Sequence, residues 1–430
     1  MIWNETKECM SRDEMSVIQS ARLVKLVDYV YHNVEFYRKK MQAIDLMPGD
    51  IKGIEDIVKL PFTTKDDLRD NYPFGLFAVP NSEIVRIHAS SGTTGKATVV
   101  GYTRRDLDIW AECVARCLTM AGVDKNDIIQ VAYGYGLFTG GLGAHGGAEK
   151  IGATVVPMSV GNSKKLTTMM VDFGATAIAC TPSYLLHISE VLENEGLIDK
   201  IKLKSAICGA EPWTEKMRHE IEARLHLKAY DIYGLSEVMG PGVACDCDYH
   251  NGLHVCEDHF YPEVLDTATL TPVADGETGE LAFTTLTKEG IPLIRYRTKD
   301  LTSIDHSPCH CGRTSARISR FKGRVDDMLI IRGVNVFPSQ IEEVILSIEE
   351  LGPHYEIVLE REGYLDKLTV KVELAQITDS FATLERISKT LKNKLKIVLG
   401  LDAKIMLESP NTLQRFEGKA KRVKDLRNIK

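Results

Sequence analysis

Short apolar stretches alternate with longer amphipathic ones across the first half of the chain. The segments "RRDLDIWAECVARCLTM" and "EPWTEKMRHEIEARL" have apolar residues at helical spacing. Around them we predict six buried strands, with the sequences "EIVRIHA", "IIQVAYG", "ATVVPMS", "ATAIACT", "LKSAICG" and "KAYDIYG". Strands that alternate with helices indicate an α/β fold, in which strands joined by helical crossovers pair in parallel.

Glycine-rich or polar turns follow three of these predicted strands. "SSGTTGKAT" follows "VRIHA", "GYGLFTGG" follows "IIQVA", and "GAEPW" follows "SAIC". Ligands of open α/β sheets bind at the carboxyl ends of the strands. We therefore expect the three turns to meet on one rim and to form a binding site there.

The two ends of the chain show other patterns. The stretch that begins at Ser11 has helical periodicity, and Ser11 with Glu14 forms a capping box at its start. From about Gly323 the sequence predicts a strand ("RVDDMLIIRGVNVFP") and a helix ("SQIEEVILSIEEL"), which Ser339 and Glu342 are expected to cap. Two strands ("YEIVLER", "KLTVKVELA"), a helix ("FATLERISKTLKNKLKIVL"), a last strand ("AKIMLES") and a basic tail complete a compact module.

The length of 430 residues allows more than one domain, and we predict a large α/β domain over residues 1–322 and a small α+β domain over residues 323–430. The net charge of −7 argues against a nucleic-acid partner, for which a basic domain is expected. No stretch approaches about 20 apolar residues, and no apolar leader opens the sequence. We therefore expect no membrane span, no signal peptide and a cytoplasmic location.

The stretch "HASSGTTGKAT", from His88 to Thr98, combines glycines, hydroxyl residues and a lysine. Backbone N–H groups exposed by glycines, together with hydroxyls and a cation, are donors that bind phosphate. The stretch is not a P-loop, because that motif requires glycine and a hydroxyl where this chain has Ser90 and Ala97. The loop is therefore predicted to bind a polyanion in another arrangement.

Five motifs occur in an order typical of one enzyme superfamily: "SSGTTGKAT", "YGLSE" (233–237), "YRTKD" (296–300), "GRVDDMLIIRG" (323–333) and a late "GK" (418–419). The chain resembles the acyl-adenylate-forming enzymes, which include acyl-CoA synthetases, adenylation domains and luciferases. "PFTTKDDLRDNYPFGLFAVP", "GAEPW", "EDHFYPEVLD" and "MLIIRGVNVFPSQIEE" make it similar to phenylacetate–CoA ligases over nearly its whole length. The resemblance implies a large N-terminal multi-sheet α/β domain and a small, mobile C-terminal α+β domain.

The resemblance also implies a reaction, which is the AMP-forming ligation of phenylacetate, or a close aryl-acetic acid, to coenzyme A in phenylacetate catabolism. The acid would react with ATP to give acyl-AMP and pyrophosphate, and the thiol of coenzyme A would then displace AMP. ATP, Mg²⁺ and coenzyme A are the implied cofactors, and the acid is the expected partner. A homodimer is left as an open possibility.

The alternative function is that of an adenylating enzyme that loads another acid onto a carrier-protein thiol. Two further rivals are a phosphotransferase or ATPase built on the glycine-rich loop and a non-catalytic zinc-binding module.

Residue roles follow from the resemblance position by position. The phosphate loop corresponds to Ser90, Ser91, Gly92, Thr93, Thr94, Gly95 and Lys96. The adenine wall and adjoining nucleotide site correspond to Gly209, Ala210, Glu211, Asp231, Ile232, Tyr233, Gly234 and Ser236. Glu237 would orient magnesium on the triphosphate, Asp300 would accept the ribose hydroxyls, and Arg324 would contact the nucleotide. Asp326 is the expected hinge, and Lys419 would reach the α-phosphate and the acyl oxygens.

Aromatic residues in "AYGYGLFTGG" are candidates for the acyl pocket. Tyr133, Tyr135 and Phe138 stand among glycines, which leave room, and aromatic faces fit a flat ring. Packing in the core is the alternative role for each ring.

The cysteines between positions 245 and 311 form a second signal. In "ACDCDYHNGLHVCED", Asn251-Gly252 is a strong two-residue hairpin turn that would pair Cys247 with Cys256. Strand alternation would then place four candidate ligands on one face: Cys245, Cys247, His254 and Cys256.

Thiolates and imidazole at such spacing suit tetrahedral zinc. Some phenylacetate–CoA ligases carry a cysteine/histidine set, and their pattern best matches Cys247, His254, Cys309 and Cys311. The resemblance thus implies a structural Zn²⁺, with Cys245 and Cys256 as spare or substitute ligands. Ordinary free thiols are the alternative.

Overall fold

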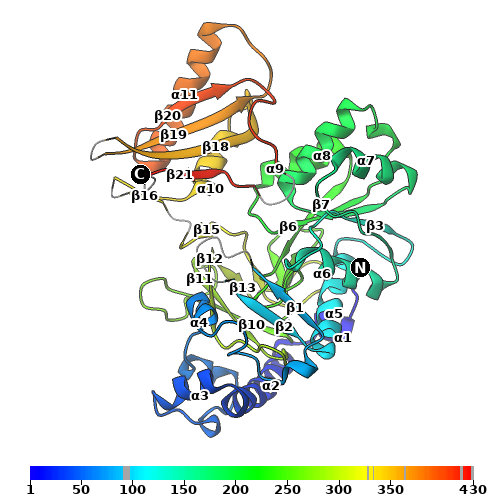
Figure 1. Ribbon diagram of the computed structural model, residues 1–430, viewed down its shortest axis with the longest axis vertical. Helices are drawn as coiled ribbons and strands as arrows, with labels where there is room; N and C mark the ends of the chain where they lie inside the picture. The colour runs from blue at the N-terminus through cyan, green and yellow to red at the C-terminus, as the bar shows by residue number, and fades with distance from the viewer. Residues whose placement is uncertain (91–96, 327–328, 333, 363–364, 417–419, 428–430) are drawn as a thin grey trace.

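The structure is a computed structural model of the 430-residue chain and describes residues 1–90, 97–326, 329–332, 334–362, 365–416 and 420–427. Its elements form a large domain and a smaller one, and the smaller one runs from yellow through orange to red in Figure 1. The small domain has an apolar core of its own, which includes Ile331, Ile357 and Leu391. The predicted class, a large multi-sheet α/β domain with a small C-terminal α+β domain, is confirmed.

A nine-stranded sheet runs through the large domain in the order β13-β14-β9-β8-β7-β6-β5-β3-β4. Its strands β3 to β7 pair in parallel, as the alternating pattern predicts. Two separate apolar clusters involve helices α5 and α6 in one case and α7 to α9 in the other. The bounds are β3 (Ile128–Val131), β4 (Thr154–Val156), β5 (Ala177–Cys180), β6 (Ser205–Gly209), β7 (Lys228–Tyr233), β8 (Ala244–Asp246), β9 (Leu253–Val255), β13 (Ile304–Asp305), β14 (Arg317–Ile318), α5 (Arg104–Met120), α6 (Gly140–Ile151), α7 (Ser163–Asp172), α8 (Pro182–Asn194) and α9 (Glu215–Leu225).

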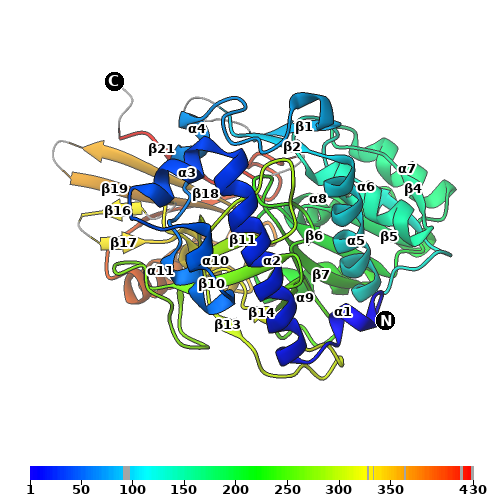
Figure 2. The same cartoon turned by 90° about the horizontal axis from the view of Figure 1, so that it is seen from below.

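A four-stranded antiparallel sheet and a group of helices complete the large domain. Figures 1 and 2 place α2 and α3 at the end of this domain that lies away from the small domain. Helix α2 begins with the predicted capping box, because Ser11 N donates to Glu14 Oε2 and Glu14 N donates to Ser11 Oγ. The bounds are α1 (Glu5–Glu8), α2 (Arg12–Asn33), α3 (Glu35–Gln42), α4 (Lys65–Asp70), β10 (Phe260–Leu265), β11 (Gly279–Thr285), β12 (Tyr296–Thr302) and β15 (Gly323–Arg324).

One predicted strand of the central sheet lies elsewhere. β1 (Arg86–Ala89) pairs in antiparallel fashion with β2 (Val99–Tyr102) and forms a separate hairpin around the glycine-rich loop. The prediction that "EIVRIHA" joins the parallel sheet is therefore wrong. A strand that returns directly after a short loop pairs with its neighbour in the antiparallel sense, because a parallel neighbour requires a longer crossover.

The small domain packs two helices against a sheet in the order β20-β19-β18-β21. The single strand predicted over "RVDDMLIIRGVNVFP" is wrong, since β16 and β17 form a hairpin there. Helix α10 begins at Pro338, and Ser339 Oγ donates to Lys322 O over 2.7 Å, so the cap predicted from Ser339 and Glu342 is also wrong. The bounds are β16 (Leu329–Ile331), β17 (Val334–Val336), α10 (Pro338–Leu346), β18 (Leu351–Glu362), β19 (Leu365–Leu374), α11 (Phe381–Leu399), β20 (Lys404–Glu408) and β21 (Val423–Asp425).

The connection between the two domains runs through the short strand β15. β15 pairs with β12, so residues 323–324, at the start of the predicted small domain, still belong to a sheet of the large domain. Among the described residues, no helix is long and apolar enough to cross a membrane.

Candidate functional site

The base of the glycine-rich loop contacts the end of the "YGLSE" motif. Ser90 N donates to Thr98 O over 3.0 Å, and Thr98 Oγ1 donates to Glu237 Oε1 over 3.3 Å. Ala89 N donates to Leu137 O over 3.0 Å, which joins β1 to the turn after β3. Two of the three predicted turns, the glycine-rich loop and the turn after β3, therefore meet although β1 lies outside the central sheet. Seven predicted site residues lie outside the described residues, namely Ser91, Gly92, Thr93, Thr94, Gly95, Lys96 and Lys419.

Glu237 is buried, and the backbone from Ser236 to Val238 accepts hydrogen bonds from side chains of two distant segments. Lys288 Nζ donates to Glu237 O and to Val238 O, each over 2.9 Å, and Tyr102 OH donates to Ser236 O over 3.2 Å. Burial lowers the pKa of Lys288 to about 7. The sequence did not indicate Lys288, because a lysine in "LTKEG" has no local feature that distinguishes it from a surface lysine.

Asp300 accepts hydrogen bonds from two residues that the sequence assigned to the same site. Tyr233 OH donates to Asp300 Oδ2 over 2.6 Å, and Arg324 Nη1 donates to Asp300 Oδ1 over 3.0 Å. Arg324 also donates to both carboxylate oxygens of Asp326, over 2.8 and 3.0 Å. The Tyr233 ring lies 4.3 Å from the Phe321 ring, centroid to centroid. Burial, and after it the charge of Asp300, raises the pKa of Tyr233 well above its usual value, so its phenol stays a donor.

Two predicted glycines of the nucleotide site have no room for a side chain. A Cβ on Gly209 would lie 2.1 Å from Ile232 O, and a Cβ on Gly234 would lie 2.7 Å from the Cα of Gly240. Ala210 has φ = +71°, a left-handed conformation that an L-residue rarely adopts. Gly209 at the end of β6 therefore lies against the backbone of β7, and Gly234 directly after β7 lies against the backbone of Gly240.

Three further side chains of the predicted nucleotide site, those of Glu211, Asp231 and Ser236, contact different parts of the structure. Glu211 Oε1 accepts from Ser183 N over 2.7 Å at the start of α8, and Glu211 Oε2 accepts from Ala420 N over 3.0 Å in the small domain. Asp231 is buried, and burial raises its pKa. Ser236 Oγ lies 2.9 Å from Thr139 Oγ1. Glu211 thus contacts the small domain, a contact that the position of "GAEPW" in the sequence did not indicate.

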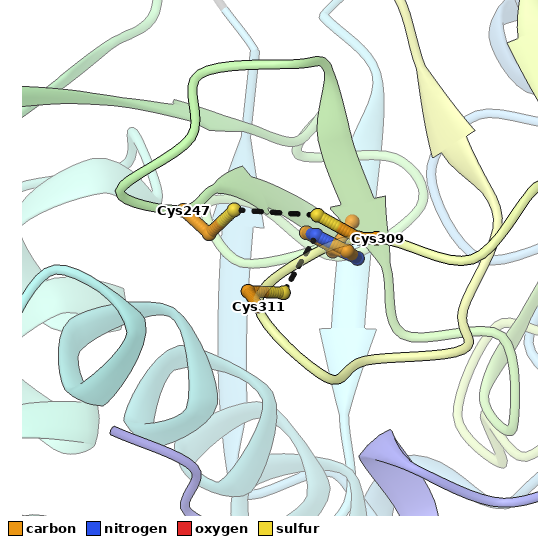
Figure 3. A group of neighbouring side chains, drawn as sticks. Cys247, Cys309 and Cys311 are labelled. Carbon is orange, nitrogen blue, oxygen red and sulfur yellow. Dashed lines mark hydrogen bonds between the residues drawn. The ribbon is translucent and has the colours of Figure 1, made fainter.

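Cys247, His254, Cys309 and Cys311 form one cluster, of which Figure 3 labels the three cysteines. Their ligand atoms all lie within 4.8 Å of one another, with Cys247 Sγ 3.8 Å from Cys309 Sγ and Cys311 Sγ 3.4 Å from His254 Nε2. Ser315 Oγ lies 3.1 Å from His254 Nδ1, which leaves Nε2 to face the sulfurs. Three thiols and one imidazole nitrogen fit tetrahedral zinc in both number and chemistry.

The hairpin that carries two of these residues has a register different from the predicted one. Cys245 lies opposite His254, so a six-residue loop replaces the predicted two-residue turn and Cys247 does not pair with Cys256. The pairing ends at Asp246 and Leu253, and the carboxylate of Asp246 accepts from Asp231 N over 2.9 Å. Cys247 therefore lies beyond the strand, where its sulfur faces Cys309.

The two spare thiols lie apart from the cluster. Cys245 Sγ lies 3.7 Å from Cys117 O, and Cys256 Sγ lies 3.7 Å from Gly242 O. The expectation that all four hairpin ligands share one zinc-binding face is therefore wrong, whereas the set taken from the resemblance is the one that the structure brings together.

Sequence comparison matches two family profiles, "AMP-binding enzyme" over residues 64–286 and "AMP-binding enzyme C-terminal domain" over residues 333–427. The chain is 52% identical to phenylacetate–coenzyme A ligase of Escherichia coli (strain K12) over 98% of its own length and 97% of that enzyme. It is 46% identical to phenylacetate–coenzyme A ligase of Thermus thermophilus, over 99% of this chain and 100% of that one. The chain belongs to the phenylacetate–CoA ligase family of AMP-binding enzymes.

Solved structures of a related ligase separate two domain arrangements. A crystal structure of 2-hydroxyisobutyryl-CoA ligase in the postadenylation state, 31% identical, matches 98% of this chain and 91% of that chain with a TM-score of 0.90. The same ligase in its thioester-forming state matches 98% of this chain and 92% of that chain with a TM-score of only 0.73. The domains of this AMP-binding enzyme are therefore arranged as in the postadenylation structure.

The aromatic residues predicted for the acyl pocket of this AMP-binding enzyme surround two glycines. A Cβ on Gly140 would lie 3.0 Å from the Phe138 ring and 3.3 Å from the Tyr133 ring, and a Cβ on Gly141 would lie 3.1 Å from the Tyr135 ring. Tyr133 is buried, whereas Phe138 is 47% exposed. The hydroxyl of Tyr133 has no hydrogen-bond partner among the described residues. The three rings therefore lie around one turn, the one that follows β3.

Proposed function

We propose that the chain joins phenylacetate, or a close aryl-acetic acid, to coenzyme A through an acyl-AMP intermediate. The curated relatives named above support the substrate and the acceptor, and they align with nearly the whole chain. The observation that carries the proposal is the convergence, on one rim, of the base of the glycine-rich loop with Glu237 and of Tyr233 with Asp300.

The chemistry requires activation because a carboxylate has a poor leaving group. In the first step a carboxylate oxygen of the acid forms a bond to the α-phosphorus of ATP, and pyrophosphate leaves. In the second step the sulfur of coenzyme A attacks the acyl carbon, the thiol proton is lost, and AMP departs with the oxygen. Preorganised donors and cations around the phosphates stabilise the charge that develops in the first step.

Each described residue has a separate task in this proposal. Asp300 would accept the ribose hydroxyls, with Arg324 and Tyr233 fixing its two oxygens. The ring of Tyr233, backed by Phe321, would stack on adenine. Glu237 would hold Mg²⁺, which would neutralise charge on the triphosphate when it is bound. Lys96 and Lys419, which lie outside the described residues, would contact the phosphates and the reacting oxygens.

The cluster of Cys247, His254, Cys309 and Cys311 is proposed to hold a structural Zn²⁺. Four protein ligands close the coordination sphere, so such a site has no position for substrate. Cys247 lies in the β8–β9 loop, and Cys309 and Cys311 lie in the segment before β14. A zinc ion bound there would link these two segments near one edge of the central sheet.

A panel of carboxylic acids with ATP, Mg²⁺ and coenzyme A tests the function. AMP and thioester should form in equal amounts, with the fastest turnover for phenylacetate or a close aryl-acetic acid. Release of ADP would indicate a phosphotransferase. Acyl-AMP formation that yields thioester only on a carrier protein, and none on coenzyme A, would indicate the carrier-loading alternative.

A further inference from the structure

Two carboxylates of the large domain contact the small domain. Glu190 lies on α8, where its Oε1 is 3.0 Å from His354 Nε2 and its Oε2 accepts from Arg415 Nε over 3.3 Å. Glu211 follows β6, and its Oε2 accepts from Ala420 N over 3.0 Å. Both acceptors belong to the large domain and these three donors to the small domain, whereas Glu190 also lies 3.5 Å from His187 on its own helix. The bonds between the domains therefore exist only when the two domains face each other as they do here.

Each end of this interface is oriented within its own domain. Glu373 on β19 accepts two hydrogen bonds from Arg415, over 2.8 and 2.9 Å, which leave Arg415 Nε directed at Glu190. Glu211 is fixed by Ser183 N at the start of α8. The Glu190 and Arg415 side chains are 21% and 17% exposed, so water screens their attraction less than that of a surface ion pair.

The small-domain partners lie on both sides of the predicted catalytic lysine. Arg415 precedes Lys419 by four residues and Ala420 follows it directly. We propose that Glu190 and Glu211 are positioning residues, which anchor Arg415 and Ala420, on the two sides of Lys419 in the sequence, to the large domain for adenylate formation. This inference rests on the proposed function, because it assigns the anchor to the first of its two steps.

The arrangement of the domains decides which step the anchor serves. The chain matches the related ligase better in its postadenylation state than in its thioester-forming state. An interaction made in one of two arrangements stabilises that arrangement alone and shifts the population towards it. Loss of the anchor therefore affects the two half-reactions unequally, whereas a general loss of structure would affect both.

Single-turnover measurement of each half-reaction tests the anchor with the variant Glu190→Gln. Formation of acyl-AMP from phenylacetate and ATP is expected to slow about tenfold, which corresponds to about 1.4 kcal/mol. Thioester formation from supplied phenylacetyl-AMP and coenzyme A is expected to stay within about twofold or to become faster. In a double-mutant cycle with His354→Gln, the double variant should slow the first step no more than the slower single variant does.

A matched control lies one turn further along the same helix. Glu193 is on α8, and its carboxylate lies 3.8 Å from Arg224 of the large domain, so Glu193→Gln should leave both half-reactions unchanged. If Glu190→Gln folds poorly, Arg415→Gln tests the same contact from the small domain. Equal slowing of both steps, or no slowing of the first, would overturn the anchor. A parent chain that forms no acyl-AMP would instead contradict the proposed function.

Discussion

The phenol of Tyr233 donates a hydrogen bond to the carboxylate of Asp300 over 2.6 Å, although 66 residues separate them in the chain. Tyr233 ends a strand of the central sheet and Asp300 lies in β12 of the second sheet. The bond therefore joins the two sheets of the large domain at the proposed nucleotide site. The hydrogen bond fixes only one oxygen of Asp300. Loss of the Tyr233 hydroxyl should therefore have a smaller effect than loss of the Asp300 carboxylate.

Replacement of the carboxylate should weaken ATP binding strongly. Asp300→Asn removes the charge that would accept the ribose hydroxyls and that now pairs with Arg324. Hydrogen bonds to charged groups contribute about 1.5–3 kcal/mol, so we expect the KM for ATP to rise roughly 10- to 150-fold. The control Tyr233→Phe keeps the ring and loses one neutral donor, and its KM should rise less than about tenfold. Unchanged KM for ATP in Asp300→Asn would contradict the ribose assignment.

The cysteine cluster should bind zinc and stabilise the fold. Purified protein should contain about one zinc per chain, and Cys309→Ser should lower both the zinc content and the melting temperature, because closed zinc sites contribute to folding energy. Cys245→Ser is the matched control, since its sulfur lies beside Cys117 O outside the cluster, and it should keep its zinc. Full zinc content in Cys309→Ser, or loss of zinc without loss of stability, would contradict a structural site.

Lys288 should make stability depend on pH above neutrality. Burial lowers its pKa to about 7 in the folded chain, whereas an unfolded lysine titrates near 10.4. Between these values the unfolded state binds more protons, so the free energy of unfolding contributed by this group rises with pH. Below about pH 7 both states are protonated and the contribution is constant. Denaturant unfolding from pH 6 to pH 10 should show this rise in the parent chain relative to Lys288→Met.

The same Lys288→Met variant should also impair the first half-reaction. Two backbone carbonyls, those of Glu237 and Val238, would lose their donor, and Glu237 would no longer be held in place. We expect a higher Mg²⁺ requirement for acyl-AMP formation, with thioester formation from supplied acyl-AMP less affected. An identical Mg²⁺ dependence in the parent and variant chains would contradict this role for Lys288.

The acyl pocket should favour aromatic acids. Burial of a phenyl ring against the rings around Gly140 and Gly141 is worth on the order of 2 kcal/mol, which is roughly thirtyfold in catalytic efficiency. Phenylacetate should therefore exceed butyrate by about this factor, and Phe138→Ala should reduce the difference. Equal catalytic efficiency for the two acids would show that these rings do not line the pocket.

Features that depend on neighbours in sequence were predictable from the sequence. The Ser11–Glu14 capping box and helix α11, Phe381–Leu399, formed as predicted, because capping and helical periodicity act over a few residues. The order of the motifs indicated the family, and the family pattern identified the four clustered ligands from Cys247 to Cys311. These conclusions need only residue types and spacing along the chain.

Tertiary structure decided the features that depend on long-range contacts. The hairpin pairs Cys245 with His254 and leaves Cys247 beyond the strand, a register that differs from the one the Asn251-Gly252 turn signal predicts, and β8 also pairs with the distant strand β7. Lys288 acquires its position because its ammonium reaches two carbonyls about fifty residues away in sequence. The contacts of Glu190 and Glu211 require one arrangement of two domains. Such contacts cannot be predicted from local pattern, since they form only when distant segments pack together.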